Sequence, residues 1–185
     1  MAERITLIEA DQAPLLVRHL FEGGDPGVIV RALATVPELA EVAVPFIGVA
    51  LGPGSVAAEA KETVILRTSA VLGCRYCVDA HTVVALDMGL GAEQVRALRD
   101  VTSQPPGDEH GNGALVAWVD SVAAGRGPVP DEIHAALAER FAEHQIVELL
   151  VTLGATVFLN RLCTALGLPT SAATFARLDA EGFGR

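Results

Sequence analysis

The sequence has few aromatic residues, few cysteines and a deficit of positive charge. Aromatic residues make up 4% of the 185 residues, whereas hydrophobic residues of all kinds make up 51%. A core with so few aromatics has to be built from alanine, valine and leucine, which favours closely packed helices over a strand-rich sandwich. We therefore predict an all-α protein whose single domain spans residues 1–185.

The shortage of positive charge excludes a class of partner. Lysine and arginine together number 13, against 23 aspartate and glutamate residues, so the formal net charge is -10. Binding to a phosphate backbone needs clustered lysine and arginine side chains. Nucleic acid is therefore not an expected partner.

Long hydrophobic runs and a disulfide framework are also missing. The longest uncharged stretch, residues 42–58, contains Pro45, Gly52, Pro53 and Gly54 and is shorter than the roughly 20 apolar residues of a membrane span. The charged N-terminus lacks the apolar segment of a secretion signal. The three cysteines are an odd number, which argues against a secreted disulfide scaffold. We expect a cytoplasmic protein with reduced thiols, no membrane partner and a hydrophobic subunit interface.

Prolines, glycines and capping residues mark where helices begin and end. We expect Pro45 to kink or split its helix, Ser55 to cap the next one, and Gly73 to end that one. The predicted helices cover residues 11–20, 27–34, 37–52, 55–72, 73–88, 91–98, 114–124, 131–141, 143–166 and a last short segment near Leu178, with a loop over 103–113.

The chemistry of the chain concentrates in residues 62–90. Cys74 and Cys77 are separated by two residues, and His81 follows Cys77 by four. In a helix that begins near Gly73, these three side chains fall on one face. Two thiols and an imidazole on one stripe form a reactive thiol site, a metal site or a coincidence.

Several local features favour a reactive thiol. A cysteine attacks only as thiolate, and Cys74 and Cys77 lie in the first helical turn, where the helix dipole favours negative charge. Arg75 adds a positive charge beside them, and each thiol can donate a hydrogen bond to the other. His81, one turn beyond Cys77, can accept its proton.

Glu62 is placed by simple geometry. If the chain turns back at Gly73 into an antiparallel helix pair, Glu62 and His81 lie roughly 16 and 12 Å from the turn, at about 1.5 Å per residue. Glu62 is then nearer in height to His81 than to either thiol. A carboxylate beside the imidazole would orient it and raise its basicity.

Glu62, Cys74, Cys77 and His81 at these spacings resemble the signature of the carboxymuconolactone decarboxylase-like superfamily, and more narrowly its alkylhydroperoxidase D-like branch. The flanking text KETVILRTSAVLGCRYCVDAHTVVALDMGLGAEQVRAL and the later HQIVELLVTLGATVFLNRLCTALGL, with its Asn160-Arg161 pair, extend the likeness over about residues 32–168.

The resemblance implies an all-α helical bundle that assembles as homo-trimers or hexamers and reduces hydroperoxides with thiols. It implies that Cys77 attacks the peroxide, that Cys74 resolves the sulfenic acid to a disulfide, and that Glu62 and His81 form the proton relay. A thioredoxin-like or lipoyl-bearing protein would regenerate the dithiol, and neither a cofactor nor a metal is expected. Tyr76 stands where the best-characterised branch has a histidine, so Tyr76 and Arg75 are expected as supporting residues.

Three other hypotheses stay open. Zinc could be bound by Cys74, Cys77 and His81 with Glu62 or Cys163 as the fourth ligand, although a structural zinc site usually has a second ligand pair at short spacing. Lactone decarboxylation, which names the superfamily, is disfavoured by the cysteine pair, which those enzymes typically lack. A non-enzymatic helical oligomer would make the thiols incidental.

The remaining cysteine and histidines form no spacing pattern. Cys163 lies in an apolar helical segment and is predicted to be a core residue. The histidines predicted to lie on the surface are His19, His110, His134 and His144.

Overall fold

The computed structural model describes residues 4–102, 111–125 and 127–184. These residues form helices joined by short connections and contain no strand, which confirms the all-α fold class. Most of the predicted 103–113 loop, His110 included, lies outside them. The elements in chain order are two 3-10 helices, η1 (Ala10–Gln12) and η2 (Leu15–Phe21), and the α-helices α1 (Val28–Leu33), α2 (Pro37–Leu51), α3 (Ala58–Val71), α4 (Arg75–Asp87), α5 (Ala92–Arg99), α6 (Gly113–Ala124), α7 (Asp131–Ala138), α8 (Glu143–Leu166) and α9 (Ala172–Ala180).

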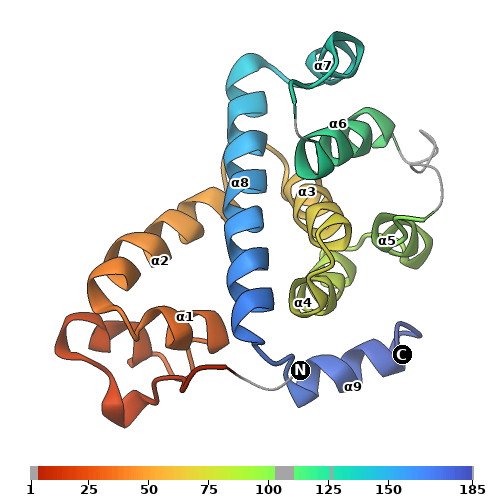
Figure 1. Cartoon of the computed structure of the whole chain (residues 1–185). Helices are drawn as coiled ribbons and strands as arrows, with labels where there is room; N and C mark the ends of the chain where they lie inside the picture. Colours follow the sequence, from red (N-terminus) through yellow and green to blue (C-terminus); the bar gives the residue numbers. More distant parts are fainter. Residues whose placement is uncertain (1–3, 103–110, 126, 185) are drawn as a thin grey trace.

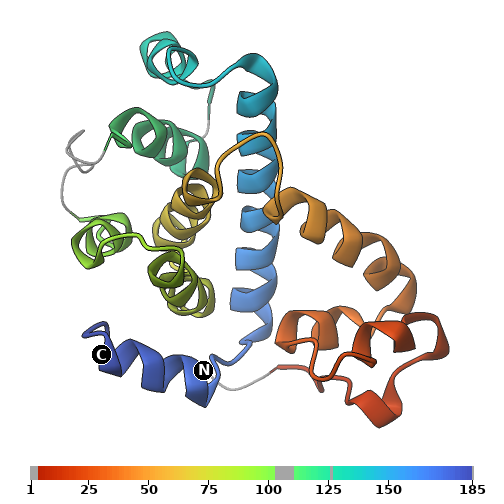
Figure 2. The same cartoon turned by 180° about the vertical axis from the view of Figure 1, so that it is seen from behind.

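The long helix α8 runs through the middle of the molecule, with α2 on one side and α3 and α4 on the other (Figures 1 and 2). Its length and composition would suffice to cross a membrane. Its buried face nevertheless carries polar side chains that bond to neighbouring helices: the Thr152 hydroxyl donates to the Ala50 carbonyl, and the Asn160 amide donates to Ser69. Such specific polar contacts with α2 and α3 are those of a core helix.

The α3–α4 hairpin is produced by Gly73. The chain reverses there through a Schellman motif, in which the Cys74 N–H donates to the Ser69 carbonyl and the Gly73 N–H donates to Ala70. Gly73 has a φ of +66°, a left-handed conformation that favours glycine. The predicted helix end at Gly73 is therefore confirmed, and α3 and α4 pack side by side (Figure 1).

Three features of the N-terminal half differ from the prediction. The segment 11–20 is not one helix but η1 and η2, because Pro14 between them lacks an N–H and disfavours a helical residue before it. The predicted kink or split at Pro45 is not a split, because α2 is continuous through Pro45 and packs against η2 and α8. Ser55 does not cap α3, which begins at Ala58; its N–H and hydroxyl both donate to Glu148 on α8 instead.

The N-terminal arm closes one end of the bundle. The Arg4 N–H donates to the Leu166 carbonyl at the end of α8, and Leu7 is buried. Leu7 joins a hydrophobic cluster whose other buried members are Ala32, Cys74, Cys77, Cys163 and Leu168. The cysteines therefore lie where α1, α4, the end of α8 and the arm meet.

Candidate thiol site

Cys74 and Cys77 lie at the N-terminus of α4 with their sulfur atoms 3.0 Å apart. Cys74 is the N-cap residue, and Cys77 is the third helical residue, so one turn of helix brings the two side chains to the same face. Both side chains are buried, and both thiols are free. The prediction that these two thiols lie on one face of a helix is confirmed.

Cys163 brings a third sulfur to the same place. It is buried, as predicted for a core residue, but its sulfur lies with those of Cys74 and Cys77 in a group whose members are all within 4.8 Å of one another. It comes from the last turn of α8, far along the chain from the other two. No motif or spacing placed it there, although the zinc hypothesis named it as a possible fourth ligand beside Cys74 and Cys77.

The three thiols have unequal proton affinities. Hydrogen bonds from Cys163 and then Cys77 lower the pKa of Cys74 to about 3. The pKa of Cys77 is raised by its hydrogen bonds to Cys163 and Cys74 and by burial. The hydrogen bond to Cys74 raises the pKa of Cys163 to about 12. The cluster thus favours one negative charge, on Cys74 at the helix N-terminus, with two thiols donating to it.

Glu62 and His81 form a pair across the α3–α4 hairpin. The Nδ1 atom of His81 lies 2.8 Å from Oε1 of Glu62, which confirms the height argument made from Gly73. The Glu62 side chain is 3% exposed and that of His81 is 24% exposed. A buried carboxylate bonded to one ring nitrogen orients the imidazole and leaves its other nitrogen for proton exchange. Within the described part of the chain, no hydrogen bond joins His81 to a thiol in this conformation.

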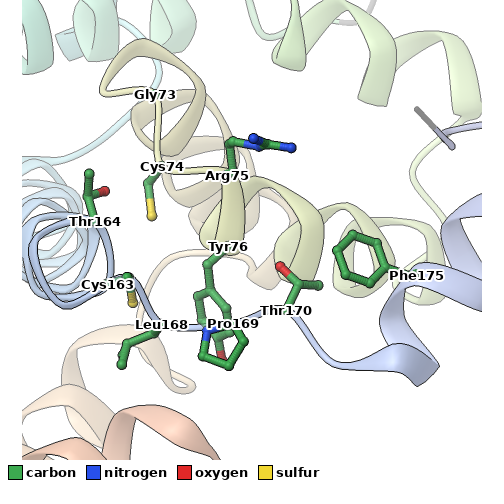
Figure 3. Close-up of a pocket in the computed structure, with 11 residues that line it drawn as sticks. Gly73, Cys74, Arg75, Tyr76, Cys163, Thr164, Leu168, Pro169, Thr170 and Phe175 are labelled. Atoms are coloured by element: carbon green, nitrogen blue, oxygen red, sulfur yellow. The ribbon is translucent and has the colours of Figure 1, made fainter. Parts of the chain in front are cut away.

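A pocket of about 260 Å³ opens beside the thiols (Figure 3). Cys74 and Cys163 line it, whereas Cys77, His81 and Glu62 are not among its lining residues in the described part of the chain. The end of α8, the loop after it and α9 form the other walls of the pocket, a combination that the sequence did not predict. The other lining residues are Gly73, Arg75, Tyr76, Thr164, Gly167, Leu168, Pro169, Thr170 and Phe175.

The two expected supporting residues behave differently. Tyr76 lies in the pocket wall, where burial, followed by the nearby cysteines, raises the pKa of its phenol to about 12, so the hydroxyl stays protonated. The Arg75 side chain points away from the Cys74 sulfur (Figure 3). Its charge acts instead on Asp79, whose pKa is raised chiefly by burial and lowered by Thr170, Arg99 and Arg75.

The zinc hypothesis predicted a ligand set that the structure does not bring together. The three cysteine sulfurs are close enough to bind a soft metal ion, but His81, a proposed ligand, is directed to Glu62. A structural zinc site takes four ligands. The donors gathered here are three thiols, which also suits thiol–disulfide chemistry.

The sequence and the fold both have relatives. Residues 37–121 match the model of the carboxymuconolactone decarboxylase family. The protein YdfG of Bacillus subtilis (strain 168) is 27% identical over 110 residues, which cover 58% of this chain and 73% of that protein.

Two solved structures illustrate the shared fold. A peroxidase-related protein with an alkylhydroperoxidase AhpD core, from Ralstonia eutropha JMP134, has a TM-score of 0.71 and 20% identity over 94% of each chain. A cysteine-to-alanine variant of the debrominase Bmp8, in complex with 2,3,4-tribromopyrrole, has a TM-score of 0.78 and 20% identity over 98% of each chain. Residues 37–121 thus match the carboxymuconolactone decarboxylase family, and the chain as a whole shares the fold of structures with an AhpD core.

Proposed function

We propose that this protein is a thiol-dependent peroxidase that reduces hydroperoxides through Cys74 and Cys77, with Glu62 and His81 as the proton relay. The observation that carries the proposal is the buried thiol pair, 3.0 Å apart at a helix N-terminus and open to a pocket through Cys74. The likeness to the Ralstonia eutropha peroxidase-related protein supports the class of reaction.

The reaction takes two electrons from the dithiol. A cysteine thiolate attacks the terminal peroxide oxygen, the O–O bond breaks, and the leaving alkoxide takes a proton to become an alcohol. The cysteine is now a sulfenic acid. The second thiol attacks its sulfur, and a disulfide and water are formed. An external dithiol then reduces the disulfide and is itself oxidised.

The order of the two thiols can be argued from access and charge. The resemblance implies that Cys77 attacks and Cys74 resolves. The pocket is lined by Cys74 and not by Cys77, and the pKa of Cys74 is the lowered one, because two thiols donate to it. Both observations favour the reverse order, with Cys74 attacking and Cys77 resolving.

The Glu62–His81 relay would act on Cys77, the thiol that has to lose its proton. The pKa of Cys77 is raised, and His81 follows it by one helical turn, so a base at His81 would help Cys77 to react. We propose Glu62 as the residue that orients this base. A thioredoxin-like or lipoyl-bearing protein in the reducing cytoplasm is the proposed source of electrons.

A thiol titration tests the function and the order together. One equivalent of cumene hydroperoxide should remove two of the three thiols per chain in wild type, and dithiothreitol should restore them. Cys77→Ser should still react, whereas Cys74→Ser should be inert; the reverse pattern would restore the order implied by the resemblance. An unchanged thiol count in wild type would contradict peroxidase function.

A second candidate is reductive debromination of an aromatic ring. The debrominase Bmp8 matches this chain over 98% of both lengths, and Tyr76 and Phe175 place aromatic rings in the pocket wall. Two thiols and a carbon–bromine bond would give a disulfide, a carbon–hydrogen bond and hydrogen bromide. Bromide release from 2,3,4-tribromopyrrole, with no reaction toward hydroperoxide, would favour this function over the first.

A further inference from the structure

Cys163 is a buried thiol that the proposed reaction does not yet use. Its sulfur lies within 4.8 Å of those of Cys74 and Cys77, and like Cys74 it lines the pocket. If Cys163 only filled space in the core, an apolar side chain of similar size would serve equally well. The position of Cys163 therefore calls for a chemical explanation.

The backbone holds Cys163 in place at the end of α8. Its carbonyl accepts hydrogen bonds from the N–H groups of Gly167 and Leu168, which end the helix with Gly167 in a left-handed conformation. Cys74 is held just as firmly by the Schellman motif after α3. Rotation of the two side chains, without movement of either helix end, is therefore the change that would bring their sulfurs together.

We propose that Cys163 is the third redox thiol of this site and competes with Cys77 for oxidised Cys74, so that oxidation also forms a Cys74–Cys163 disulfide that joins α4 to α8. This inference rests on the proposed function, because it needs an oxidant to act on Cys74. Cys163 also donates the hydrogen bond that contributes most to the lowered pKa of Cys74.

Each step balances. The sulfenic acid on Cys74 reacts with the Cys163 thiol to give the disulfide and water. The Cys77 thiolate can then attack Cys74, which forms the Cys74–Cys77 disulfide and releases Cys163 as thiolate. Because both sulfurs of the Cys74–Cys163 disulfide belong to pocket-lining residues, a reducing dithiol would reach either of them through the pocket.

Peptide mapping distinguishes the two disulfides. Trypsin cleaves after Arg75, so Cys74, Cys77 and Cys163 fall in separate peptides, 68–75, 76–96 and 162–177. Protein treated with one equivalent of cumene hydroperoxide is unfolded in acid, and its remaining thiols are blocked with N-ethylmaleimide. In wild type we expect two linked products, peptide 68–75 joined to 162–177 and peptide 68–75 joined to 76–96. In Cys77→Ser and in Cys77→Ala, the link between 68–75 and 162–177 should be the majority product.

The controls separate this inference from the proposed function. Cys163→Ser should give only the Cys74–Cys77 link. The Cys77→Ser/Cys163→Ser double variant should accumulate a sulfenic acid that dimedone traps. If Cys77→Ser also accumulates dimedone-reactive Cys74 with no link to Cys163, the inference is wrong while the peroxidase function stands.

Diamide, which oxidises neighbouring thiols directly, supplies the other arm. A Cys74–Cys163 link after diamide in Cys77→Ser, with no thiol loss after hydroperoxide in wild type, would overturn the peroxidase function and leave the three-thiol centre standing. If no Cys74–Cys163 link forms after either oxidant, the proposal that Cys163 is a redox thiol is wrong.

Discussion

At the scale of single residues, the site depends on which group holds a proton. Cys74 favours the thiolate because two thiols donate to it, whereas Cys77 holds its proton more tightly than an ordinary thiol. Glu62 is almost fully buried, and its Oε1 atom bonds to Nδ1 of His81, which fixes the orientation of the imidazole. Under the proposed function, His81, four residues after Cys77 on α4, would be the acceptor of the Cys77 proton.

The relay predicts the effect of two substitutions. His81→Gln should lower peroxide turnover near pH 7 by about 10²–10⁴-fold, the usual contribution of a positioned acid–base group. Glu62→Gln should cause a smaller loss, because it removes only the partner that orients the imidazole. Raising the pH should rescue both, since hydroxide can then deprotonate the thiol. The measurement is a pH–rate profile of hydroperoxide consumption.

The matched control is His19→Gln. His19 also lies beside a glutamate, Glu41, at 3.6 Å, but on the surface and away from the thiols. Its rate profile should match wild type. A profile for His81→Gln that coincides with that of His19→Gln would remove the relay from the mechanism.

At the scale of elements, the turn between α3 and α4 sets the geometry of the site. Gly73 adopts a left-handed conformation, and the next residue is Cys74, whose N–H completes the turn. The same turn determines that Glu62 on α3 faces His81 on α4. The site thus depends on one glycine that contributes no side chain.

Gly73→Ala should destabilise the fold. A Cβ there would meet no atom within 4 Å, so the cost is the strain of a left-handed alanine, about 1 kcal/mol. Urea unfolding measures this free energy. Gly91→Ala is the control, because Gly91 has an ordinary φ of -63° and equal free space. Equal unfolding free energies for the two variants would show that the left-handed turn is unstrained.

The connection before α3 is tied to α8 by Glu148. Its carboxylate accepts hydrogen bonds from Ser55 and lies 2.6 Å from Nζ of the buried Lys61. The Lys61 hydrogen bond and then that of Ser55 lower the pKa of Glu148 from 4.5 to about 2. The carboxylate thus anchors the connection before α3, whereas the N-cap position of α3 is Ala57 and has no side-chain cap.

This lowered pKa predicts part of the acid sensitivity. A carboxyl group whose pKa is lower in the folded state stabilises the fold above its unfolded pKa, and the contribution is lost as the pH falls through its folded pKa. For Glu148 the window runs from about pH 4.5 down to about pH 2. The thermal midpoint of Glu148→Gln should therefore be lower than that of wild type at pH 7 and should fall less steeply in this window. The exposed Glu59→Gln should follow wild type, and parallel curves for Glu148→Gln would contradict the assignment.

At the scale of the whole molecule, two packed helices carry an exposed apolar face. On α2 it consists of Leu39, Val42, Phe46 and Val49, and on α8 of Val147, Leu150, Val151 and Phe158. A monomer rarely exposes so many large apolar side chains on neighbouring elements. Each copy of this chain carries a net charge of -10, so two copies repel each other over most of their surface. This repulsion is weakest at an uncharged face, so we propose that a second copy of this chain covers the apolar face on α2 and α8.

Charge introduced into this face should disrupt a homo-oligomer. Val49→Asp replaces a side chain that is 78% exposed in the single chain, so it should leave the fold intact and lower the mass in solution. Multi-angle light scattering gives the mass, and circular dichroism checks the fold. Val101→Asp, 45% exposed outside this face, is the control. A wild-type mass equal to that of one chain would contradict the trimer or hexamer expected from the family resemblance.

The sequence by itself determined the fold class and the local part of the site. Helical spacing puts Cys74 and Cys77 on one face, and the glycine at 73 reverses the chain, so a rise of about 1.5 Å per residue is enough to bring Glu62 to His81. These relations depend on backbone geometry within two neighbouring helices. These relations can be predicted from the sequence because the packing of the other helices changes them little.

Only the tertiary structure decided what surrounds this local unit. Cys163, Glu148 and the pocket-lining segment after α8 come from distant parts of the chain, and their positions depend on how α8 packs across α2, α3 and α4. The same packing turns Arg75 away from the thiols and leaves Cys74, not Cys77, at the pocket. Helix packing is set by the fit of many side chains at once, and no spacing within a single segment encodes it.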